Sequence, residues 1–181
     1  MKLARIGNPS KEKPIIVDKD NNYRDVSSVI KDFNSDHLNF ETLEKLSKIK
    51  PEDLPILEKN QRIGACVNKP SKFIGIGLNF KDHAIEQNMP IPKEPIIFSK
   101  FTNSVSGPND DIVIPKNSNH TDWEVELGFV IGKKCSYVSE KDALSYVLGF
   151  FLVNDVSERN FQKNKGGSWD KGKGFDTFGP I

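Results

Sequence analysis

The chain has 181 residues, and 36% of them are hydrophobic, which is enough to build a folded core and argues against wholesale disorder. The formal net charge of +1 gives no electrostatic reason to expect nucleic acid or an acidic membrane as a partner. Two cysteines, Cys66 and Cys135, are too few for a disulfide framework, and the sequence shows neither an apolar run of transmembrane length nor a signal-peptide pattern. The sequence therefore predicts a cytoplasmic protein that binds neither nucleic acid nor membrane.

Residues 1–70 have the pattern of a small N-terminal α/β domain. MKLARIG predicts a first strand, and PIIVDKDNNYRDV predicts two strands joined by a turn rich in Asp and Asn. LNFETLEKLSKI carries apolar residues at helical spacing, so we expect a helix over residues 38–49. Two prolines, Pro51 and Pro55, follow that helix and interrupt regular structure.

Residues 71–181 have the pattern of a second, larger domain that is mostly β. Strands are predicted in KFIGIGLNF, IIFSKF, DIVIP, DWEVELGFVIG and YVLGFFLVND. Helical turns are predicted in KDHAIEQN and in SEKDALSYV, where Ser139 is a suitable N-cap. The remaining stretch, from residue 158 onward, is polar and rich in glycine.

Three carboxylates in the second domain suggest a metal site. In DWEVELG, Glu124 and Glu126 are two residues apart and therefore point to the same face of a strand. This pair alone could equally be two solvated charges on an edge strand. Asp155, however, ends the apolar run GFFLV, and three carboxylates at neighbouring strand ends suit a hard divalent cation. Without His or Cys at zinc-like spacing, Mg²⁺ or Mn²⁺ is expected, with Ca²⁺ as a further option.

His83 and Glu86 form a second candidate group. If KDHAIE is helical, they share a face and can form a hydrogen bond. A carboxylate beside an imidazole raises its basicity and fixes its orientation, which suits a general base. Taken alone, such a pair is more often a surface contact.

Two segments resemble nucleotide-binding loops, but both lack essential residues. GIGLNF has Phe80 where the dinucleotide fingerprint requires its third glycine. GSWDKGKG matches the phosphate-loop pattern up to Lys173, but Gly174 replaces the Ser or Thr that would bind Mg²⁺. Neither segment supports a nucleotide-binding function.

Taken together, these motifs resemble the fumarylacetoacetate hydrolase family. The resemblance runs from about Lys72 to Ile181 through GLNFKDHAIE, EPIIFSK, GPNDDIVIP, TDWEVELGFVIG, VNDVSERNFQ and KGKGFDTFGP, in the order of the family. It implies an α+β, mostly β fold: a mixed β-roll of the fumarylacetoacetate hydrolase type with the small N-terminal α/β module. The family's C-terminal part, with its substrate loop, is missing, so the roll is expected to be incomplete at the C-terminus.

The resemblance also implies roles for individual residues. It assigns Glu124, Glu126 and Asp155 to the metal, and it assigns catalysis to His83, Glu86 and Lys173. It assigns the substrate site to Arg159, Gln162 and Lys100. It further implies a homodimer when the chain is complete.

The implied reaction is metal-dependent hydrolysis of a carbon–carbon bond in a 2,4-diketo acid, with release of pyruvate. Leu78 stands where decarboxylating relatives carry Arg, while GLNF and DTFGPI look more like the subgroup that acts on 2,4-diketo-3-deoxy sugar acids. Isomerisation, decarboxylation and ureidoglycolate lysis through a similar enolate remain alternatives. A non-catalytic fragment that keeps the fold is a further alternative.

Overall fold

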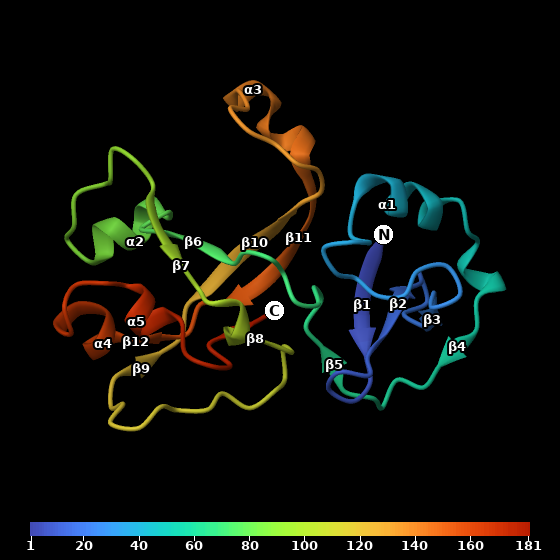
Figure 1. Ribbon diagram of the computed structural model, residues 1–181, viewed down its shortest axis with the longest axis horizontal. Helices are drawn as coiled ribbons and strands as arrows, with labels where there is room; N and C mark the ends of the chain where they lie inside the picture. Colours follow the sequence, from blue (N-terminus) through green and yellow to red (C-terminus); the bar gives the residue numbers. More distant parts are fainter.

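The computed structural model describes all residues from 1 to 181 and contains more strand than helix. Its sheets are small and do not close into a barrel. Figure 1 shows one sheet on one side of the molecule and the shorter sheets on the other. No helix of the chain has the length and apolar character that crossing a membrane requires.

The N-terminal part forms a five-stranded antiparallel sheet in the order β4-β3-β2-β1-β5. Its strands are β1 (Lys2–Ile6), β2 (Lys13–Val17), β3 (Tyr23–Asp25), β4 (Ile56–Leu57) and β5 (Ile63–Gly64). Helix α1 (Phe40–Ser47) begins after Asn39, whose side chain accepts a hydrogen bond from the Thr42 N–H, and a 3-10 turn follows at Pro51–Asp53. The strands and helix expected in this part are therefore present.

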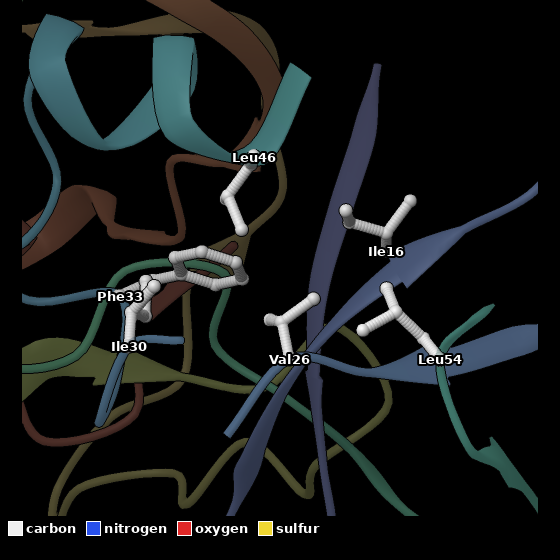
Figure 2. Packing of buried hydrophobic residues seen from close by; sticks show 6 residues of the cluster. All are labelled: Ile16, Val26, Ile30, Phe33, Leu46 and Leu54. Atoms are coloured by element: carbon white, nitrogen blue, oxygen red, sulfur yellow. The ribbon is translucent and has the colours of Figure 1, made fainter. Parts of the chain in front are cut away.

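A compact apolar cluster holds α1 against this sheet. Figure 2 shows how its side chains converge from helix α1, strand β2 and the connecting segments. The cluster consists of Ile16, Val26, Ile30, Phe33, Leu46 and Leu54. Because burial of each such side chain contributes about 1.5–3 kcal/mol, this cluster gives the N-terminal part a hydrophobic core of its own. The expected boundary near residue 70 stays a prediction.

The second part consists of four two-stranded sheets. Three are antiparallel and one is parallel. The antiparallel pairs are β6 (Ile74–Gly77) with β7 (Ile96–Ser99), β9 (Thr121–Asp122) with β12 (Ser157–Glu158), and β10 (Val125–Ile131) with β11 (Val147–Asn154). The parallel pair is β8 (Val105–Ser106) with β13 (Gly179–Pro180).

Short helices connect these strands. They are α2 (Lys81–Glu86), α3 (Glu140–Ala143), α4 (Arg159–Asn164) and α5 (Asp170–Lys173), with 3-10 turns at Thr102–Ser104 and Leu144–Tyr146. Figure 1 shows α3 at the far end of the long β10–β11 hairpin, and it shows α4 and α5 together near β12. The glycine-rich stretch from residue 158 onward thus contains two helices.

Three sequence expectations differ from the structure. DIVIP is not a strand, and residues 111–115 run as an irregular segment. DWEVELGFVIG is two strands, because the chain leaves β9 at Asp122 and enters β10 at Val125. SEKDALSYV is one short α-helix followed by a 3-10 turn, although Ser139 caps it as expected by accepting a hydrogen bond from the Asp142 N–H.

Candidate active site

An acidic face lies at the start of strand β10. Side chains alternate here as the sequence predicts: Trp123 and Val125 are exposed, whereas Glu124 and Glu126 are partly buried. The antiparallel register pairs Val125 with Asn154, so Asp155 lies next to Glu124 across the hairpin. The Asp155 N–H donates to the Glu124 carbonyl oxygen over 2.8 Å, which fixes the two residues side by side.

The ammonium group of Lys173 joins two of these carboxylates. Its Nζ donates to Glu124 Oε2 over 2.9 Å and to Asp155 Oδ2 over 2.7 Å. The side chain is only 2% exposed, and its Nζ also lies 5.0 Å from the centre of the Phe98 ring. The structure thus places the lysine of the GSWDKGKG segment in the acidic site.

Close packing of α5 against α4 brings Lys173 to this position. A Cβ atom added to Gly172 would lie 2.6 Å from the Glu158 carbonyl oxygen and 2.7 Å from the Gln162 backbone nitrogen. Only glycine therefore allows the two helices to approach so closely. The glycine before Lys173 has a packing role, which explains the Gly-Lys pair without a phosphate loop.

Helix α4 adds a guanidinium group to the same site. Arg159 Nη1 lies 2.6 Å from Glu124 Oε1, and its Nη2 donates to Asp122 Oδ2 over 2.8 Å. Gln162 is buried and accepts a hydrogen bond from Arg159 through Oε1 over 3.3 Å. Both oxygens of Glu124 are thus occupied by cations, one from Lys173 and one from Arg159.

Lys100 lies beneath this site and is 1% exposed. Its Nζ donates to Asp155 Oδ1 and to the Lys173 carbonyl oxygen, each over 2.6 Å, and to the Val156 carbonyl oxygen over 3.3 Å. All three N–H groups are therefore used within the protein. In this placement the ammonium has no donor free to reach a ligand, and the assignment of Lys100 to the substrate site stays a prediction.

The two glutamates experience different electrostatic environments. Burial alone would raise the pKa of Glu124, but the neighbouring Lys173 and Arg159 outweigh it and hold the pKa below its ordinary value. Burial raises the pKa of Glu126, and repulsion from Glu124 and Asp155 adds to the increase. The pKa values of the two glutamates are therefore shifted in opposite directions.

Asn79 is the one polar side chain that bonds to Glu126. Its Nδ2 donates to Glu126 Oε2 over 3.1 Å, from the segment between β6 and α2. Leu78, directly before it, has a φ of +50°, which is uncommon for a residue with a side chain. Sequence analysis missed both Asn79 and Asp122 as site residues, although both lie inside motifs that it singled out.

His83 and Glu86 lie on α2, as expected, but no hydrogen bond joins them. The His83 side chain has no hydrogen-bond partner among the residues of the site either. Catalytic hydrogen bonds are often long or absent before substrate binds, so this geometry leaves the predicted role of His83 open to test.

The donor set of the acidic face is made of carboxylate oxygens, which are the ligands that Mg²⁺ and Mn²⁺ prefer. No group of three or more His, Cys, Asp or Glu side chains has the geometry to hold an ion, and the Lys173 ammonium lies between Glu124 and Asp155. The chemistry of the donors thus fits a hard cation, while Lys173 would have to turn aside to admit one. The assignment of Glu124, Glu126 and Asp155 as metal ligands stays a prediction.

Comparison with known proteins agrees with this architecture. Two relatives named "Putative hydrolase", from Burkholderia multivorans and Burkholderia ambifaria, are each 56% identical to the chain over all 181 residues. The match covers 64% of either relative, so the chain spans somewhat less than two thirds of the length of the curated relatives that it matches.

Two solved structures resemble the chain over nearly its full length. The fumarylacetoacetate hydrolase from psychrophilic Exiguobacterium antarcticum has a TM-score of 0.80 and 26% identity, and the match covers 100% of this chain and 64% of that one. The 5-carboxymethyl-2-hydroxymuconate delta-isomerase from Mycobacterium smegmatis has a TM-score of 0.71 and 27% identity, covering 99% and 64%. The family model described as "Fumarylacetoacetate (FAA) hydrolase C-terminal" matches residues 72–181, and the chain therefore belongs to the fumarylacetoacetate hydrolase family.

Proposed function

We propose that the protein, at the full length of its relatives, hydrolyses a carbon–carbon bond in a 2,4-diketo acid and releases pyruvate. The observation that carries this proposal is the buried Lys173 ammonium, held against Glu124 and Asp155 with Arg159 beside it. Two cations next to an acidic face can bind the carboxylate and the oxo groups of such a substrate. The names of the relatives and of the Exiguobacterium structure support hydrolysis.

The cationic groups would bind the substrate and stabilise negative charge on its oxygens. Lys173 and Arg159 can exchange their present carboxylate partners for the substrate carboxylate and the developing oxyanion. Gln162 orients Arg159 through the hydrogen bond described above. Members of the family generally use a divalent metal, and one held by Glu124, Glu126 and Asp155 would supply Lewis-acid chemistry.

His83 would act as the general base. It takes a proton from water, whose oxygen attacks C4 of the substrate. The C3–C4 bond then breaks, and its electron pair moves onto C3 and the adjacent 2-oxo group as the enolate of pyruvate. Return of the proton to C3 completes pyruvate, and the other product is the carboxylic acid formed at C4. Glu86 would hold the imidazole in position during both proton transfers.

Isomerisation of a related keto acid is the second candidate. It is favoured by the name of the Mycobacterium smegmatis structure, a delta-isomerase with 27% identity. The same cations could stabilise an enolate that is reprotonated at another carbon without cleavage. Decarboxylation and ureidoglycolate lysis would use the same charges, but no observation in the structure favours them.

A direct assay separates these reactions. The chain, extended to full length with the segment of the Burkholderia multivorans relative that it does not cover, is supplied with 2,4-diketo-3-deoxy sugar acids and acylpyruvates. We expect pyruvate release, and we expect Lys173→Met to lower kcat/KM about 10²–10³-fold, as loss of one oxyanion donor does. The control is Lys171→Met, since Lys171 lies on α5 but is exposed and outside the acidic site. Isomerised product without pyruvate would reject hydrolysis, and unchanged turnover in Lys173→Met would reject the proposed site.

A further inference from the structure

Glu158 is a buried carboxylate at the start of helix α4, directly before Arg159. It is 0% exposed, and every group that donates a hydrogen bond to it is neutral. A charge that is removed from water in this way costs stability unless hydrogen bonds compensate it. The groups that donate these bonds therefore indicate what the side chain holds in place.

Most of the donors lie in the segment that leads into strand β9. The Ser118 hydroxyl, the His120 N–H over 3.1 Å and the Thr121 hydroxyl over 3.3 Å all donate to Oε2 of Glu158. Its Oε1 accepts from the Asn160 N–H over 3.1 Å, within α4 itself. Burial alone would raise the pKa of this carboxyl, but the hydrogen bonds hold the pKa below its ordinary value, so the group is ionised at neutral pH.

The backbone around the start of α4 holds the same segment a second time. The Arg159 N–H donates to the His120 carbonyl oxygen over 2.9 Å, so His120 is bound at its N–H by Glu158 and at its carbonyl group by Arg159. Directly after it, β9 pairs with β12 and brings Asp122 opposite Ser157 (Figure 1). The position of Asp122 therefore depends on the segment that Glu158 holds.

Asp122 in turn orients the side chain of Arg159. Its Oδ2 accepts from Arg159 Nε over 3.1 Å and from Nη2 over 2.8 Å, and these two bonds fix the plane of the guanidinium group. Nη1 faces Glu124 and Gln162 instead. If Nη1 exchanges Glu124 for a substrate carboxylate, as in the function proposed above, Asp122 and Gln162 would be the partners that still hold the guanidinium group.

We propose that Glu158 is a positioning residue for substrate binding: it fixes the segment that carries Asp122, and Asp122 orients the Arg159 guanidinium toward the substrate carboxylate. The inference rests on the proposed function, which supplies that carboxylate. Capping of α4 alone would require only the bond from the Asn160 N–H. The other bonds go to the segment before β9, so the side chain does more than cap the helix.

The test measures Glu158→Gln in the chain extended to full length with the segment of the Burkholderia multivorans relative that it does not cover. The variant keeps the size of the side chain but replaces one acceptor oxygen by an NH₂ group, which cannot accept the bonds made there. We expect KM for the diketo acid to rise at least about fivefold while kcat changes less than about twofold, because loss of binding that is equal in the ground state and the transition state raises KM alone. A purely structural role gives a different result: fewer folded molecules lower the apparent kcat and leave KM unchanged.

Asp18→Asn is the matched control. Asp18 is also a buried carboxylate, 9% exposed, and accepts hydrogen bonds from backbone and side-chain groups, but it follows β2 in the N-terminal sheet. We expect its KM to equal that of the wild type. Asp122→Asn should raise KM as Glu158→Gln does, and combining the two should add less than about a further twofold, because residues that act through one another are not additive. Ser118→Ala, which keeps the carboxylate, should raise KM in the same direction and serves if Glu158→Gln does not fold.

Hydrogen exchange gives a second readout that needs no turnover. The amide hydrogens of residues 118–122 should exchange at least about tenfold faster in Glu158→Gln than in the wild type, because local opening depends on the bonds that hold the segment. Unchanged exchange there, or a lower kcat with an unchanged KM, would overturn the proposal. If the full-length wild type cleaves no diketo acid, the proposed function fails, and the dissociation constant of pyruvate, which offers the same carboxylate, replaces KM. An equal dissociation constant for Glu158→Gln and the wild type would then overturn the inference as well.

Discussion

Asp155 is held between two buried ammonium groups. Lys100 donates to its Oδ1 and Lys173 to its Oδ2, over 2.6 and 2.7 Å. Burial lowers the pKa of Lys100, and the charge of Asp155 offsets part of that effect. Because Lys100 also bonds to two backbone carbonyl groups, it ties the end of β7 to the end of β11 and to α5. Lys100 is therefore a positioning residue for the acidic site.

We predict that Lys100→Met lowers the free energy of unfolding by about 3 kcal/mol, because it leaves a buried carboxylate with one partner fewer. The value is at the low end of the range for a broken buried ion pair, since Lys173 still compensates Asp155. Urea denaturation measures the change. Lys45→Met is the control: Lys45 pairs with Glu41 on the exposed surface of α1, and we expect its loss to cost below about 0.5 kcal/mol. Equal stabilities of the two variants would contradict the role given to Lys100.

The carboxylates of the site could be predicted from the sequence, because their positions follow from local patterns. Alternation on a strand puts Glu124 and Glu126 on one face, and the end of an apolar strand marks Asp155. The residues that form hydrogen bonds with these carboxylates could not be predicted in the same way. Asn79 reaches Glu126 across 47 positions of sequence, and this contact depends on how β6 packs near β10, which no local pattern encodes.

Helix α2, near the site, makes few stabilising contacts with the rest of the protein. It has six residues, and only Ala84 is buried. Ile85 is 62% exposed, and Phe80 at the N-cap position provides no side-chain hydrogen bond. A helix this short, with so little buried apolar surface, opens at low free-energy cost. The element that carries His83 can therefore open without unfolding of the rest of the chain.

We predict that the amide hydrogens of α2 exchange with solvent at least about a hundredfold faster than those in the middle of β10 and β11, because a few kcal/mol separate local from global opening. Hydrogen exchange followed by mass spectrometry measures this difference. Helix α1 is the control, since Leu46 anchors it in the N-terminal core and it should exchange more slowly than α2. Protection of α2 equal to that of β10 would show that it is a fixed part of the structure.

Among the elements, the long strands β10 and β11 could be predicted from their pattern, whereas the segment DIVIP shows where such a pattern fails. Strands β10 and β11 have seven and eight residues and a clear alternating or apolar pattern. DIVIP has an equally apolar pattern, but Val113 and Ile114 are exposed and no strand pairs with them; the Val113 N–H bonds instead to the Thr177 side chain. Apolar content predicts a strand only where a partner edge exists, and that depends on the tertiary fold.

At the scale of the whole molecule, a charge network joins the N-terminal sheet to the rest. Arg62, just before β5, donates to Asp110 over 2.6 Å, to Glu12 over 2.9 Å and to the Gly7 carbonyl oxygen over 3.2 Å. Arg5 bonds in turn to Glu12. Such an arrangement could not be predicted from the sequence, because its members come from four separate segments and no local pattern encodes which charged residues pair.

The link between Arg62 and Asp110 makes stability depend on pH. The Arg62 guanidinium holds the pKa of Asp110 below its ordinary value of 3.8. A carboxylate whose pKa is lowered by folding stabilises the folded state above its unfolded pKa, and this contribution is lost as the pH falls through the folded pKa. The contribution of the link should therefore be complete at neutral pH and be lost as the pH falls through the folded-state pKa of Asp110, which lies below 3.8.

We predict that Arg62→Ala lowers the free energy of unfolding by about 1–2 kcal/mol at pH 7, as expected for charged hydrogen bonds that are partly exposed. At a low pH, below the folded-state pKa of Asp110, the difference between variant and wild type should shrink, because Asp110 is then protonated in both. Urea denaturation at the two pH values measures this change. Lys13→Ala removes a pair with Asp25 in which the lysine is 55% exposed, and it should cost less at pH 7. A cost of Arg62→Ala that is the same at both pH values would mean that the guanidinium stabilises the two parts through packing and its bond to the Gly7 carbonyl oxygen, and not through its charge.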